Sequence, residues 1–66
     1  MNISEACVII ERQAKLEGTG ILEVLQNIDS YGIHDYISCY GLSDDFRQAY
    51  NVFMFNARQM FAKVEA

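Results

Sequence analysis

The chain contains no proline, so only glycine can be expected to interrupt a helix anywhere along its 66 residues. Its four glycines, at positions 18, 20, 32 and 41, fall between stretches in which apolar residues recur with helical spacing. They divide the chain into four segments, which we expect to be helices over residues 4–17, 20–31, 33–40 and 44–64. The sequence therefore predicts an all-α fold in a single helical domain, residues 1–66, built as a small three- or four-helix bundle with a long C-terminal helix.

Residues that commonly cap helices lie where these segments begin. Asn2 and Ser4 are candidates at the first helix, and Thr19 is a candidate at the second. The very short connection between these two helices predicts that they are antiparallel neighbours. Residues 33–40 are the least certain segment, because tyrosine and isoleucine also favour strands. With no second strand to pair with, a short helix is favoured, and a structured turn is the alternative.

The C-terminal segment carries the clearest helical signal. Ser43 is a good N-cap, and Asp44 and Asp45 place negative charge at the positive end of the helix dipole. A helix over residues 44–64 is roughly 31 Å long. Its core-facing stripe is predicted to contain Phe46, Ala49, Tyr50, Phe53, Ala57, Met60, Phe61 and Val64. For the whole chain we expect a core of Ile3, Cys7, Ile10, Ile21, Leu25, Ile28, Tyr36, Tyr50, Phe53, Ala57, Met60 and Phe61.

An uncharged seam runs along the opposite side of the same helix. It consists of Gln48, Val52, Phe55, Gln59 and Ala62, which recur at alternating spacings of four and three. This is the 3.5-residue period of helices that pack against a partner helix. The seam predicts contact with another protein, and we expect a homodimer formed through this helix. The alternative is that the other helices enclose the long one completely, so that the seam belongs to the core.

The middle of the chain is uniformly acidic. The formal net charge is −4, and no lysine or arginine occurs between Leu16 and Phe46. A field of one sign favours a basic partner, so Glu23, Asp29 and Asp35 are candidate partner-binding residues. The alternative is an ordinary solvated surface that maintains solubility. In size and acidity the chain resembles small phage-encoded inhibitors, anti-CRISPR proteins among them, although it shares no motif with them.

No set of residues in the sequence suggests catalysis, a metal or a cofactor. The single histidine, His34, lacks a nucleophile or a second ligand at a suitable spacing. Cys7 and Cys39 lie among apolar neighbours, so we expect both to be small buried residues in a reducing, cytoplasmic environment. The N-terminus has no signal-peptide pattern, and no apolar run is long enough to span a membrane.

These observations predict a non-catalytic protein-binding protein: a small adaptor, regulator or inhibitor. The alternative is a dimeric nucleic-acid-binding regulator. Its basic surface would come from the first and last helices, through Arg12, Lys15, Arg47, Arg58 and Lys63. Phosphate contacts supply much of the affinity in such complexes, and the acidic middle of this chain opposes them. Direct binding to nucleic acid is therefore the less favoured expectation.

Overall fold

The computed structural model contains four helices: α1 (Ile3–Glu17), α2 (Ile21–Tyr31), α3 (Ile33–Tyr40) and α4 (Asp44–Glu65). It describes the backbone of residues 1–65 and the side chains of residues 1–60. The predicted all-α helical bundle is confirmed, with the C-terminal helix as its longest element. The segment over residues 33–40 is a helix and not a turn.

The ends of the helices follow local backbone chemistry. Asn2 caps α1, since its Oδ1 accepts a hydrogen bond of 2.9 Å from the backbone N–H of Glu5. Gly18 ends α1 in the left-handed conformation, with φ at 70°, where glycine carries no steric penalty. The prediction of Thr19 as the cap of α2 is wrong. Its backbone N–H completes the end of α1 by bonding to Ala14, and Gly20 begins α2 instead.

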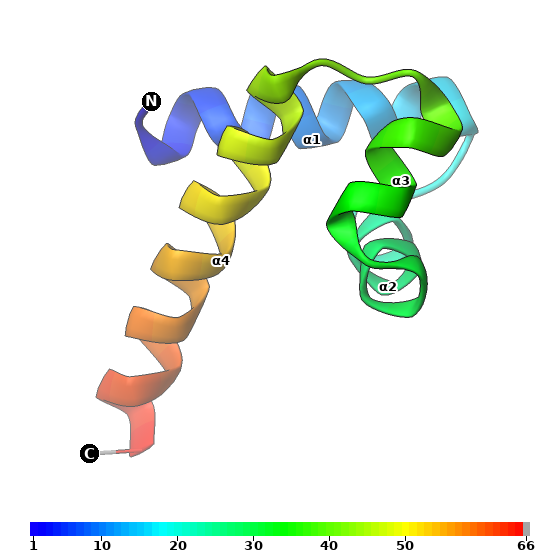
Figure 1. Ribbon diagram of the computed structural model, residues 1–66. Helices are drawn as coiled ribbons and strands as arrows, with labels where there is room; N and C mark the ends of the chain where they lie inside the picture. Colours follow the sequence, from blue (N-terminus) through cyan, green and yellow to red (C-terminus); the bar gives the residue numbers. More distant parts are fainter. Residues whose placement is uncertain (66) are drawn as a thin grey trace.

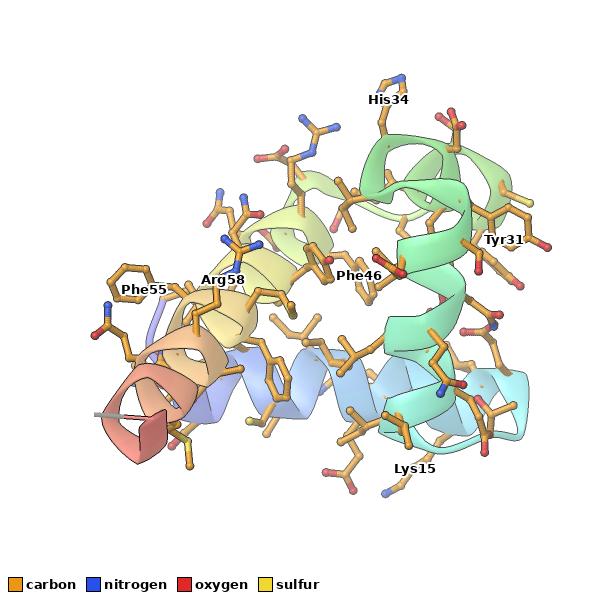
Figure 2. The ribbon with its side chains drawn as sticks, turned by 90° about the horizontal axis from the view of Figure 1, so that it is seen from below. Lys15, Tyr31, His34, Phe46, Phe55 and Arg58 are labelled. Atoms are coloured by element: carbon orange, nitrogen blue, oxygen red, sulfur yellow. The ribbon has the colours of Figure 1, made fainter. Side chains whose placement is uncertain are left out.

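Helix α4 is the main neighbour of α1, while α2 and α3 form the other side of the molecule (Figure 1). The predicted antiparallel pairing of α1 with α2 is wrong, because α2 crosses α1 and does not fold back along it (Figure 2). The three-residue connection between the two helices turns the chain sideways. Helix α3 then leads back toward α4 and contacts it.

The core lies where α1, α4 and the α2–α3 pair meet. Among the predicted core residues, Ile10, Ile28 and Tyr36 are confirmed as buried. Six others are only half-buried: Cys7, Ile21, Leu25, Tyr50, Phe53 and Ala57. Ile3 and Met60 are exposed, so those two predictions are wrong, and the side chain of Phe61 lies outside the described part. The remaining buried apolar residues are Ala6, Ala14, Val24, Phe46 and Ala49.

Small residues explain why the centre of the core differs from the prediction. Ala6 and Ala14 on α1, and Ala49 on α4, are almost completely buried. Alanines allow two helix backbones to approach closely, so burial concentrates at the contact between α1 and α4. Ile3 is the first residue of α1, and Met60 belongs to the second half of α4. That half of the helix extends beyond the other helices (Figure 1).

Candidate interaction surfaces

The outer side of α4 is largely open in the single chain. Gln48, Phe55 and Gln59 are exposed, and Phe55 retains 63% of its accessible surface and points away from the body of the molecule (Figure 2). Val52 differs from the rest of the seam because it is half-buried and packs against the core. The side chain of Ala62 lies outside the described part. The alternative in which the other helices enclose this seam is therefore wrong for the described residues other than Val52.

The acidic candidates lie on α2 and α3. Glu23, Asp29 and Asp35 are all exposed. Glu23 also has a structural role, since its carboxylate accepts a hydrogen bond of 2.9 Å from the backbone N–H of Gly20 and so completes the start of α2. Asp29 and Asp35 have no such bond among the described contacts, and they are the more available of the three for a partner.

A hydrogen-bonded cluster that was not predicted from the sequence joins α1 to α3. The hydroxyl of Tyr36, which is fully buried, donates to the Glu17 carboxylate. The side-chain amide of Gln13, which is also buried, donates to the same carboxylate oxygen at 3.2 Å. The pKa of Tyr36 is raised above its ordinary value. Burial of the hydroxyl is the largest cause, and the hydrogen bond to Glu17 is the second. Tyr36 is 19 positions from Glu17 in the sequence, so helical periodicity could not have paired the two residues.

Next to this cluster, a groove separates α1 from the connection between α3 and α4. One part of it has a volume of about 300 Å³ and is lined by Ile9, Arg12, Leu16 and Leu42, among others. Leu16 keeps 78% of its surface exposed at the rim. The lining combines apolar side chains with the charged side chains of Arg12 and Asp45.

The basic side chains of α1 and α4 do not converge in the single chain. Lys15 and Arg58 point to different sides of the molecule (Figure 2). Lys15 also pairs with Glu11 on the same helix, at 3.5 Å. The guanidinium of Arg47 is 3.4 Å from the His34 ring, which links α4 to α3. The side chain of Lys63 lies outside the described part.

Residues with potential for metal binding or redox chemistry are dispersed. Within the described part of the chain, no three histidine, cysteine, aspartate or glutamate residues gather around one point. The expectation that both cysteines are buried is wrong, since Cys7 is half-buried and Cys39 is exposed. Cys39 lies on the last turn of α3, a short helix that buries only Tyr36 fully. None of the described helices has the length and apolarity needed to cross a membrane.

The chain matches no protein-family model, no curated protein and no solved structure at a significant level. Function must therefore be argued from the surfaces of the molecule itself.

Proposed function

We propose that this chain is a non-catalytic protein-binding protein, an adaptor, regulator or inhibitor, that acts as a homodimer formed through α4. The observation that carries the protein-binding part of the proposal is the outer side of α4, where Phe55 is 63% exposed between the uncharged side chains of Gln48 and Gln59. Aromatic side chains are enriched at the centre of protein interfaces, and polar groups form the rim around them.

The acidic side of the molecule supplies the second element of the proposal. Asp29 and Asp35 lie exposed on the neighbouring helices α2 and α3, in a stretch of sequence without lysine or arginine. Charges of one sign accelerate encounter with a partner of opposite sign and orient it. The partner class that fits is a protein with a basic surface, for example one whose basic groove binds nucleic acid. An inhibitor would then occupy that groove in place of the nucleic acid.

The first experiment is affinity capture with matched baits. Wild type and Phe55→Asp are compared with Leu22→Asp, which places the same charge at another exposed apolar residue, 68% accessible, on α2. We expect capture by wild type and by Leu22→Asp, and loss of capture by Phe55→Asp. Equal capture by all three baits would contradict a role for the outer side of α4.

The acidic surface is tested by reversing its charges. In the triple variant Glu23→Lys, Asp29→Lys, Asp35→Lys we expect the protein to associate more slowly with its basic partner. The rate of that association should also depend less strongly on the salt concentration. Because Glu23 also supports the start of α2, the double variant Asp29→Lys, Asp35→Lys serves as the control for folding. Unchanged association kinetics in both variants would leave the acidic surface as a solubility feature.

A gel-shift series at low salt tests the nucleic-acid alternative. Phosphate contacts are strongest at low ionic strength, so a regulator of that kind would bind there most tightly. We expect no shift of DNA or RNA by the purified protein. A shift that disappears steeply as salt rises would favour the alternative over the proposal.

A further inference from the structure

The apolar residues on the core-facing side of α4 become less buried toward the C-terminal end of the helix. At the start of the helix, Phe46 and Ala49 are buried against the rest of the molecule. Further along, Phe53 and Ala57 are half-buried, and Met60 is 69% exposed. In the sequence the stripe continues at Phe61 and Val64, whose side chains lie outside the described part. The apolar stripe of the helix is therefore longer than the core that the other three helices build.

Two measures of shape agree with this interpretation. The accessible area of the chain is 4710 Å², whereas a compact monomer of this mass is expected to expose about 4250 Å². The radius of gyration is 12.0 Å, compared with about 10.8 Å for a compact chain of this length. Figure 1 shows the cause, because the second half of α4 extends away from α1, α2 and α3. Both values exceed those of a compact chain, as expected for a molecule in which one helix extends beyond its neighbours.

We propose that a second copy of this chain covers the stripe formed by Phe53, Ala57 and Met60, so that two incomplete cores join into one. The stripe is continuous with the chain's own core through Phe46 and Ala49, and an identical stripe therefore offers a surface of the same width and polarity. This assigns self-association to the core-facing side of α4 and leaves the outer side, with Phe55, for a different protein.

The size of the core argues for a second copy over a foreign partner. Among residues 1–60, whose side chains are described, only eight apolar residues are buried, and three of them, Ala6, Ala14 and Ala49, are alanines. Chains of this length bury only about 60% of their surface on folding, and many small domains gain stability from oligomerisation. A second copy of the chain can supply such support whether or not a foreign partner is present.

The positions of the other helices determine how two copies can meet. Helix α1, with a smaller contact from α3, packs against the first half of α4, and the second half extends away from them (Figure 1). A parallel pair would bring both bodies to the same end, where they would collide. An antiparallel pair places them at opposite ends, with the exposed stripes crossing near Ala57. Alanine at this position allows the two helices to approach closely.

The test compares two variants that carry the same new charge on the same helix. Met60→Asp and Phe55→Asp change residues that are 69% and 63% exposed in the single chain. The two positions are about 140° apart around the helix, so they lie on different sides of it. Molar mass is measured by light scattering over a dilution series, and helix content is measured by circular dichroism.

We expect the wild type and Phe55→Asp to be dimers, and Met60→Asp to be a monomer at the same concentrations. A wild-type monomer, or a dimer that Phe55→Asp splits and Met60→Asp does not, would overturn the proposal. If Met60→Asp loses its helix content, Met60→Gln provides the second measurement, because it adds no charge. A dissociation constant for Met60→Gln equal to that of the wild type would also overturn the proposal.

The result is separable from the test of the proposed function. Phe55→Asp is expected to lose capture of a foreign partner and to keep its dimer, whereas Met60→Asp is expected to lose its dimer. Loss of capture and loss of the dimer in the same variant would mean that one side of α4 serves both purposes.

The antiparallel arrangement has its own measurement. Spin labels are attached at Gln48→Cys in a Cys7→Ala, Cys39→Ser background, since Gln48 is exposed on the first half of α4. With the crossing near Ala57, the two labelled positions are about 27 Å apart along the helices, plus the contribution of the labels. A short distance, near the spacing of two adjacent helices, would indicate a parallel pair and overturn this arrangement.

Discussion

Replacing Tyr36 by phenylalanine removes one oxygen atom, the hydroxyl oxygen. This hydroxyl makes the only described side-chain hydrogen bond between α1 and α3, to the carboxylate of Glu17. These two helices make no close backbone contact in the described chain, so the long side chain of Tyr36 spans the space between them. The ring stays in place in the variant, because it stacks on Phe46 with centroids 5.6 Å apart and contacts Tyr40 at 4.6 Å. The change therefore isolates the hydrogen bond from the packing.

The expected loss follows from the character of that bond. A hydrogen bond to a charged group contributes about 1.5–3 kcal/mol to stability. The lower end applies here because Glu17 is half-exposed and keeps the hydrogen bond from Gln13 at 3.2 Å, so its carboxylate remains solvated in the variant. A loss of about 1.5 kcal/mol corresponds to a decrease in Tm of about 6–12 °C for a domain of this size.

Thermal and urea unfolding followed by circular dichroism provide the measurement. Tyr31→Phe is the matched control, since Tyr31 is 62% exposed at the end of α2 and points into solvent (Figure 2). All variants are compared at one protein concentration, because dimerisation makes Tm concentration-dependent. If Tyr36→Phe were as stable as Tyr31→Phe, the hydrogen bond would make no net contribution and the reasoning would be refuted.

The same tyrosine predicts how stability changes with pH. Burial raises the pKa of Tyr36 in the folded chain, so the folded state holds the phenolic proton more tightly than the unfolded state does. The resulting stabilisation is fully present below the ordinary tyrosine pKa of about 10 and is lost as pH rises above it. We expect the stability difference between wild type and Tyr36→Phe to shrink above about pH 10. A difference that stayed constant up to pH 11.5 or so would contradict this linkage.

Three further substitutions test the fold. Ile10→Ala leaves a cavity at a fully buried position between α1 and its neighbours and should lower the free energy of unfolding by about 2–5 kcal/mol. That is a large part of the roughly 3–10 kcal/mol of total stability expected for a chain of this length, and urea unfolding measures the change. Asn2→Ala removes the cap of α1 and should cost about 1 kcal/mol, with Asn2→Asp as the control that retains an acceptor. Gly18→Ala places a side chain at φ 70° and should lower Tm, whereas Gly20→Ala, at negative φ, should lower it less.

The helices could be predicted from the sequence because their boundaries depend on local chemistry. Glycine at positions 18, 32 and 41 adopts positive φ and ends a helix in each case, as the absence of proline had indicated. Even the uncertain segment over residues 33–40 is helical, because no strand partner competes for it. The outer side of α4 was also recognisable, since the uncharged seam around Phe55 is a periodic pattern.

The arrangement of the helices could not be predicted in the same way. Whether α2 folds back along α1 or crosses it depends on the conformation of a three-residue connection, and composition leaves that conformation open. Met60 fits the apolar period of α4 as well as Phe46 does, yet it is exposed because the other helices end before they reach it. Periodicity shows which side of a helix faces inward, but it carries no information on how far the cover extends.

The gradual loss of cover along α4 has a consequence for the kinetics of hydrogen exchange. Backbone amides near Phe46 and Ala49 can exchange only when the core opens, whereas amides beyond Ala57 need only local fraying of the helix in an isolated chain. One continuous helix thus combines two classes of protection, and the boundary between them marks where its neighbours stop. On association through Met60 that boundary would move toward the C-terminus, so the exchange rates of a few amides would follow the fraction of dimer as the protein is diluted.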